Sequence, residues 1–203
     1  MKKRRLPIPL ILLIPIVLLV VVAAAGLYRF SLSDEEIRAK FPQPTPTQDA
    51  LMQQVFGIAT PNPWTIKVPE ATAYSLLTRR QDARAIGQYQ DGEVRGDIWV
   101  DTHQLIELGE GRYAAPLIVS NQGSGLFYYL ALFEYDSARQ RMISRDEVLL
   151  GDRIVVEAVD RNQDVIAVTL RTREEDQPMS EEPKVTRTIM MTVTEQNSWA
   201  IRP

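Results

Sequence analysis

An uncharged apolar run at residues 6–27 constrains this chain more than any other feature. At about 1.5 Å of helical rise per residue, such a run is long enough to cross a hydrocarbon core of roughly 30 Å. Four cations precede it, namely Lys2, Lys3, Arg4 and Arg5. Positive charge before an apolar helix keeps the N-terminus in the cytoplasm. The pattern predicts a basic tail at 1–5 and a single-pass transmembrane signal-anchor helix at 6–30 in the cytoplasmic membrane. The lipid bilayer is therefore an expected partner, and the C-terminal part is expected in the periplasm.

A cleaved signal peptide is the competing interpretation of the same segment. Ala23, Ala24 and Ala25 offer the small residues that cleavage after Ala25 would need. The apolar run is longer than the core of roughly 7–15 residues that signal peptides usually have, which favours a retained anchor. Both interpretations place the remaining chain outside the cytoplasm.

A helical and proline-rich stem is expected at 31–63. Ser33 and Glu36 form a capping box for a short helix, and three prolines at 42, 44 and 46 then stiffen a linker at 41–47. A second helix is predicted at 48–56, because the apolar residues Leu51, Met52, Val55 and Phe56 fall on one side of it. The stem would hold the following domain away from the bilayer.

Strand periodicity begins at Trp64 and predicts a β-rich domain at 64–203. The runs 112–120 and 126–135 flank the segment 121–125, which reads as a hairpin with glycines that supply positive φ. Both faces of the run 126–135 are apolar, so this strand is expected to be central and covered on both sides. Further strands are predicted at 141–148, 153–159, 165–173, 184–194 and 198–202. Their short connections favour an antiparallel meander, and the fold class is α+β, mainly β.

Charge and cysteine content exclude several functions. The chain has 23 basic and 26 acidic residues, so the part after the basic tail is distinctly acidic. Binding to nucleic acid depends on neutralised phosphates, and no nucleic-acid partner is expected. The absence of cysteine excludes disulfides, thiolate metal sites and a cysteine nucleophile.

Candidate catalytic groups are few, and each has a plain structural explanation. His103 is the only histidine, with Asp101 two residues before it. Ser124 lies between two glycines, but without the spacing of a nucleophile elbow. Four carboxylates could serve glycoside cleavage if a cleft paired them: Asp91, Glu93, Asp97 and Asp101. Solvated turns account for all of these equally well, so no catalytic residue and no cofactor are predicted.

Two clusters could bind a partner. The acidic loop with Glu174, Asp176, Glu181 and Glu182 has clustered carboxylates such as calcium prefers, but it lacks EF-hand spacing, and no metal site is predicted. An aromatic set on one strand is the candidate interaction surface, although core packing would explain one or both of its alternating faces. Its members are Phe127, Tyr128, Tyr129, Phe133 and Tyr135.

The region 112–194 resembles an uncharacterised family of bacterial envelope proteins. The resemblance is carried by the segment Gly-Ser-Gly-Leu-Phe-Tyr-Tyr-Leu at 123–130 and by Leu-Gly-Asp-Arg-Ile at 150–154. The segment Asp-Gln-Pro-Met at 176–179 and the strand around Thr188 are also similar. This resemblance implies export and a β-rich domain but no defined activity. The chain departs from the family at 108–111, where relatives often carry an acidic loop, and at Ser180 and Glu181, where they often have cysteines.

Three functions remain open at this stage. The first is a non-catalytic envelope module that engages another envelope protein or a surface. The second is a carboxylate-dependent hydrolase that acts on cell-envelope material. The third is calcium-responsive folding through the acidic loop.

Overall fold

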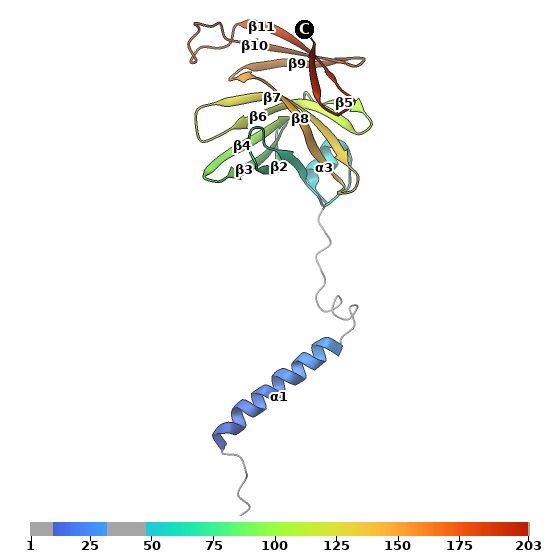
Figure 1. The fold of residues 1–203 in the computed structure, drawn as a ribbon, viewed down its shortest axis with the longest axis vertical. Coiled ribbons are helices and arrows are strands. Elements are labelled where there is room, and N and C mark those ends of the chain that lie inside the picture. The colour runs from blue at the N-terminus through green and yellow to red at the C-terminus, as the bar shows by residue number, and fades with distance from the viewer. Residues whose placement is uncertain (1–9, 32–47, 203) are drawn as a thin grey trace, which may run out of the picture. The chain divides into compact units, whose positions relative to one another are not determined.

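The computed structural model describes residues 10–31 and 48–202, drawn in colour in Figure 1. The chain divides into two compact units, Met1–Pro46 and Thr47–Pro203, which are described separately. The first unit contains one helix, α1 (Leu10–Ser31), with Pro15 inside it. In the described part of the chain, no helix meets the combined requirements of length and apolarity for a membrane span. The predicted basic tail, the helix at Ser33 and the linker at 41–47 lie outside the described residues.

The second unit begins with the short helix α3 (Ala50–Phe56), as the apolar spacing predicted. Its N-cap is Asp49, whose Oδ1 accepts a hydrogen bond from the Met52 backbone N–H at 2.8 Å. Gly57, at φ 69°, ends the helix in the left-handed conformation that glycine adopts without steric cost. Leu51 and Met52 are buried on the side that faces the following strands.

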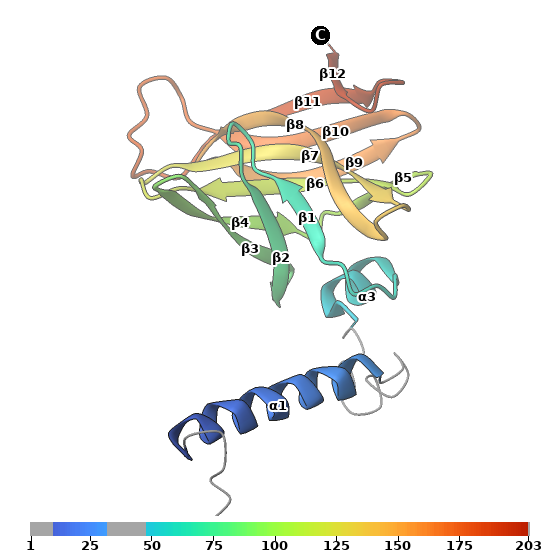
Figure 2. The same cartoon turned by 60° about the horizontal axis from the view of Figure 1, so that its bottom comes forward.

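Seven strands close into a barrel. The chain forms β1 (Trp64–Lys67), β2 (Tyr74–Gln81), β3 (Arg84–Asp91), β4 (Val94–Asp101), β5 (Ile106–Gly109), β6 (Arg112–Ser120), β7 (Leu126–Asp136) and β8 (Arg141–Asp152). Their order in the sheet is β4-β3-β2-β1-β8-β7-β6-β5, and a further pairing of β4 with β6 closes the ring and leaves β5 on the outside. Figure 2 shows the strands of the barrel, with α3 at one end.

The predicted antiparallel meander is therefore too simple. Consecutive strands do pair antiparallel within β1–β4 and within β5–β8, but β1 pairs with β8 in parallel through Thr65 and Ile143. Short connections reveal neighbouring pairs only, whereas closure joins strands that lie far apart in the sequence. Closing the sheet also satisfies edge strands that would otherwise be open to other chains.

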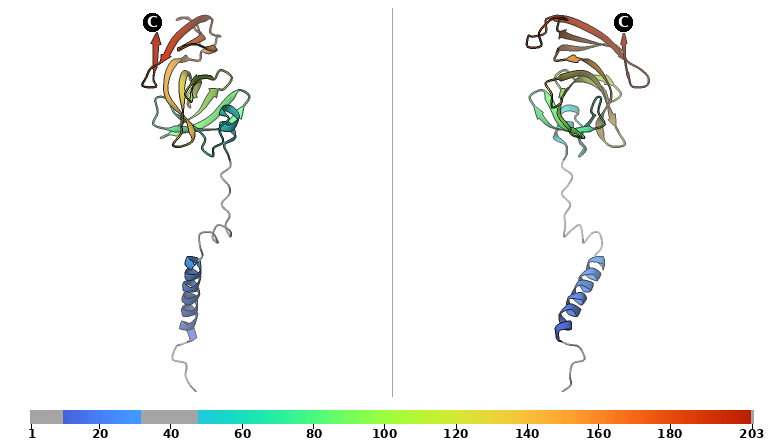
Figure 3. Two further views of the ribbon diagram at one scale, coloured as in Figure 1. Left: turned by 90° about the vertical axis from the view of Figure 1, so that its right-hand side faces the viewer. Right: turned by 60° about the vertical axis from the view of Figure 1, so that its left-hand side comes forward.

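A second, four-stranded sheet covers one outer side of the barrel (Figures 1 and 3). It consists of β9 (Val155–Asn162), β10 (Val165–Thr172), β11 (Val185–Val193) and β12 (Trp199–Arg202), all paired antiparallel in the order β12-β11-β10-β9. Its inner residues, such as Ile166, Val168 and Leu170, pack against Leu130 and Leu132 of β7. The strands predicted beyond residue 140 are confirmed, with shifts of a few residues at their ends.

Strand β7 is covered on both faces, as its sequence predicted. Tyr129, Ala131 and Phe133 point into the barrel, whereas Leu130 and Leu132 point toward the second sheet. Inside the barrel, the ring of Phe133 contacts Trp64 edge-on, with centroids 4.9 Å apart. Because residues 47–203 contain both of these cores, this unit has what an independently folding domain requires.

The hairpin predicted around residues 121–125 is confirmed, but its glycines do not take the predicted positive φ. Ser120 pairs with Leu126, and neither Gly123 nor Gly125 has positive φ. Side chains close this five-residue loop instead. The Asn121 Oδ1 accepts from the Gly123 N–H at 3.0 Å, and Arg153 donates to both oxygens of Ser124, at 2.8 and 2.7 Å. Positive φ occurs at shorter turns, for example at Gly92.

Candidate functional site

The outer surface of β2, β3 and β4 carries polar side chains, and we call these outward side chains the polar wall. Burial alternates along β4, where Ile98 and Val100 lie in the barrel core and Asp97, Trp99 and Asp101 do not. Strand β3 alternates in the same way. On β2, Tyr74 and Leu76 retain 64% and 47% of their accessible surface. The polar wall is therefore open to solvent.

The register of β3 and β4 places the side chains of the polar wall opposite one another in pairs, which form short rows across the strands. Opposite neighbours on β3 and β4 are Arg84 with Asp101, Ile86 with Trp99, Gln88 with Asp97, and Gln90 with Arg95. The Gln88 Nε2 donates to the Asp97 Oδ1 at 3.1 Å. Each charged residue in these rows thus faces an opposite charge or an amide, so these rows of β3 and β4 offer donors and acceptors with little net charge.

A first cleft, the His103 cleft, lies at the end of the polar wall where β4 leads into the next loop. It has a volume of about 430 Å³. Its lining includes Gln81, Asp82, Arg84, Trp99, Asp101 and His103. Asp101 also orders the loop, because its Oδ1 accepts from the His103 backbone N–H at 2.9 Å.

A second cleft, the Tyr74 cleft, lies along the same strands toward their other ends. It is shallower and larger, with a volume of about 750 Å³. Its lining includes Tyr74, Gln88, Gln90, Arg95, Asp97 and Gln122. The two clefts thus share strands β3 and β4, and each combines an aromatic ring with amide, arginine and aspartate side chains; the first also has a second aspartate and His103.

The four carboxylates predicted from sequence are not brought together. Asp97 lines the Tyr74 cleft, and Asp101 lines the His103 cleft. Asp91 accepts from the Thr72 Oγ1 at 2.6 Å and from the Thr72 N–H at 3.2 Å, and these bonds hold its pKa below the usual range. Glu93 is exposed in the turn between β3 and β4. The carboxylate that does share a cleft with Asp101 is Asp82, which the sequence did not single out.

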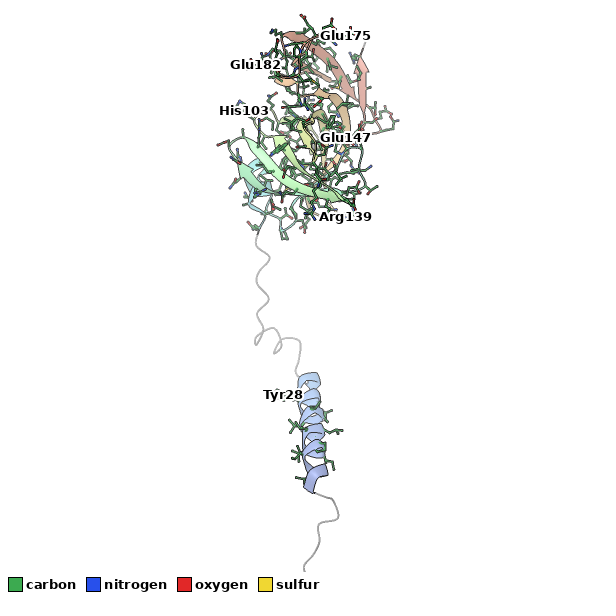
Figure 4. All side chains as sticks on the ribbon, turned by 90° about the vertical axis from the view of Figure 1, so that its left-hand side faces the viewer. Tyr28, His103, Arg139, Glu147, Glu175 and Glu182 are labelled. Carbon is green, nitrogen blue, oxygen red and sulfur yellow. The ribbon has the colours of Figure 1, made fainter. Side chains whose placement is uncertain are left out.

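The remaining polar candidates have structural partners. Arg173 binds the acidic loop by donating to the carbonyl oxygens of Glu181 and Met179, at 3.1 and 3.2 Å. Glu175 and Glu182 lie at the end of the domain formed by the second sheet, away from Arg139 at the opposite end (Figure 4). Across residues 10–31 and 48–202, no group of three or more acidic or histidine side chains is placed to hold a metal ion.

The predicted aromatic surface is divided between two packed layers. Tyr129 and Phe133 are buried in the barrel core, and Phe127 and Tyr135 pack against that core. Tyr128 points the other way, toward the second sheet. Burial raises the pKa of Tyr129 to about 12. None of these five side chains is exposed.

Sequence reasoning did not single out Tyr74, which is exposed, or Trp99, which is half-buried like Phe127, Tyr128 and Tyr135 but lines a cleft. A signal was present in β4, which reads Val-Arg-Gly-Asp-Ile-Trp-Val-Asp. The tryptophan stands at a position where the alternation calls for a polar residue. A ring in the outward phase of an amphipathic strand does not fill the barrel core, and Trp99 is therefore a candidate contact residue.

The chain matches no protein-family model, no curated protein and no solved structure. The resemblance of region 112–194 to a family of envelope proteins therefore stays a prediction.

Proposed function

We propose that this chain is a membrane-anchored, non-catalytic envelope protein whose domain binds another component of the envelope through the polar wall. The observation that carries the proposal is an exposed strand surface with two clefts, each with an aromatic ring set among hydrogen-bonding groups. Binding sites are typically concave, with a few polar groups that fix the orientation of the ligand.

Anchorage is supported by the sequence of the first 30 residues. The cations Lys2 to Arg5 and the uncharged run 6–27 are the signals that orient a single-pass segment with its N-terminus in the cytoplasm. Residues 64–203 would then be periplasmic. Protease added to spheroplasts should digest this region before lysis, and digestion only after lysis would refute the proposed location. The mass of the purified mature chain distinguishes a retained anchor from cleavage after Ala25.

Site-specific photo-cross-linking tests the binding surface. A cross-linking residue at Tyr74 or Trp99 of the full-length protein should capture a reproducible envelope component. The matched control is the same residue at Met190, which is 43% exposed on the second sheet. Equal capture at both surfaces, or none at either, would refute binding through the polar wall.

A hydrolase acting on cell-envelope material is the second candidate, and one observation favours it. Asp82, Asp101 and His103 line the same cleft. Glycoside hydrolases use two carboxyl groups with different pKa values across the scissile bond. Incubation of the purified protein with isolated cell-wall material should release soluble products if this candidate is right, and Asp82→Asn and Asp101→Asn should each abolish the release. Absence of products from the wild-type protein would eliminate it.

A further inference from the structure

We infer that the component bound by the polar wall is an uncharged glycan chain that stacks on Trp99 and Tyr74. This inference rests on the proposed function and specifies the class of its ligand. Aromatic rings and hydrogen-bonding side chains alternate along the polar wall. A glycan matches this pattern because each of its sugar units has an apolar face and polar hydroxyl groups.

The aromatic rings suit the apolar faces of sugar rings. Trp99 is half-buried, lies opposite Ile86 on the neighbouring strand and lines the His103 cleft. Tyr74 is 64% exposed at the Tyr74 cleft. Aromatic side chains provide large contact areas at low entropic cost because few of their bonds rotate. A sugar ring presents C–H groups to such a surface and keeps its hydroxyls at the edge.

The polar groups beside the rings suit hydroxyls. Amides such as Gln88 and Gln90 both donate and accept, Arg84 and Arg95 donate, and Asp97 accepts. A hydroxyl does both, so it can bind any of these groups. A carboxylate or phosphate can only accept and would leave the aspartates without a partner.

The charge of the wall distinguishes this ligand from an anionic one. Arg84 lies opposite Asp101, and Asp97 lies in the same cleft as Arg95. Polyanions such as nucleic acids bind through cations that are free to neutralise phosphates. The Tyr74 cleft has no net charge, and Asp82 gives the His103 cleft one net negative charge, so neither cleft has the excess of cations that a polyanion needs.

The spacing of the two clefts requires more than one sugar. Trp99 and Arg95 are four residues apart on β4, or about 14 Å at 3.4 Å per residue. Arg95 lies opposite Gln90, and the register of β2 with β3 places Tyr74 at the same level. This distance exceeds the length of one sugar ring, so an oligosaccharide can occupy both clefts while a monosaccharide occupies one.

Titration calorimetry with linear β-1,4-linked N-acetylglucosamine oligomers tests the inference on residues 47–203, which contain both cores. The hexamer should bind at least tenfold more tightly than the monomer. Trp99→Ala should weaken hexamer binding at least tenfold, and Tyr74→Ala several-fold. Met190→Ala is the matched control and should bind like the wild type. If Trp99→Ala lowers the melting temperature, Gln88→Ala provides the same test from an exposed position.

Three outcomes would overturn the inference: no hexamer binding, equal binding of hexamer and monomer, or tighter binding of a polyanion such as polygalacturonate. The cross-linking experiment separates these failures from failure of the proposed function. Capture at Tyr74 and Trp99 without hexamer binding means that the wall binds another kind of envelope component. Absence of specific capture refutes the binding function itself.

Discussion

The barrel has two outer sides that meet different surroundings. On β6 and β7, the outward side chains Ala114, Leu130 and Leu132 are fully buried beneath the second sheet. On β3 and β4, the corresponding positions carry residues such as Gln88 and Asp97 and face solvent. The inward residues are apolar on both sides. The inward-facing side chains of the strands therefore form the barrel core, and the outward-facing side chains determine what each side contacts.

Truncating an inward-facing side chain should cause the largest loss of stability, because both sides of the barrel enclose the same core. Phe133→Ala removes a fully buried ring that contacts Trp64. Loss of such a ring costs about 3–5 kcal/mol of unfolding free energy. Urea denaturation of residues 47–203 measures this loss. A change below about 1 kcal/mol would mean that the barrel interior is not the principal core.

The outward phase provides a direct comparison of the two sides. Leu130→Ala on the covered side should cost about 2–5 kcal/mol, since it opens a cavity beneath the second sheet. Leu76→Ala on the polar wall should change stability by about 0.5 kcal/mol or less, since this side chain is 47% exposed. The same urea series compares both variants. Similar losses for the two leucines would show that the sides do not differ in burial.

The junction between the two sides is sensitive to added volume. A Cβ atom at Gly96 would lie 2.0 Å from the Ser120 carbonyl oxygen on β6 and 2.5 Å from the ring of Tyr89. Gly96→Ala should therefore destabilise the domain by about 1–3 kcal/mol. The control is Gly123→Ala in the exposed hairpin loop, where the nearest atom is the Asn121 Oδ1 at 3.1 Å and no backbone atom of another strand is close. If both variants melt like the wild type, β4 and β6 do not approach as described.

Two carboxyl groups should show the smallest effects, with opposite dependence on pH. Burial, followed by the nearby Asp146, raises the pKa of Glu147, while Lys67 partly opposes the shift. A carboxyl with a raised pKa contributes stability that is present below its ordinary value of about 4.3 and is lost as pH rises through the raised value. Glu147→Gln should therefore gain stability relative to the wild type between pH 4 and pH 7, measured as a shift of the urea midpoint. A constant difference across this range would contradict the raised pKa.

Asp91 supplies the reverse case at the rim of the polar wall. Its hydrogen bonds from Thr72 lower its pKa, so its contribution is present above about 3.9 and is lost as pH falls through the lowered value. Asp91→Asn should therefore differ most from the wild type at neutral pH and least in strong acid. The same urea midpoints, taken at several pH values, test this expectation.

Sequence reasoning predicted the elements more successfully than their long-range arrangement. The two apolar faces of β7 showed that this strand is covered on both sides, and the spacing of Leu51 and Met52 predicted helix α3. The pairing of β1 with β8 and of β4 with β6 left no local pattern, because closure depends on strand tilt and twist summed over the whole sheet.

The candidate site was predicted less well, for a related reason. The aromatic residues that are dense in the sequence lie on β7, where Tyr129 and Phe133 are buried in the barrel core and the other three are half-buried. The rings on the polar wall are isolated in the sequence, and Tyr74 and Trp99 come together with their polar neighbours only through strand register. A search for aromatic residues in the polar phase of amphipathic strands would have found Trp99.

The parallel junction of β1 and β8 also affects how the domain is made. Thr60 on the approach to β1 donates its hydroxyl to the Gln140 carbonyl oxygen 80 residues later, and the Lys67 N–H donates to the Ser144 Oγ. During synthesis the ring therefore cannot close until more than two thirds of the polypeptide has been made, and until then β1 presents an unpaired edge. Contacts between such distant segments form slowly. A nascent chain that paired β1 with β2 before β8 was made would therefore expose the free edge of β1 to other chains.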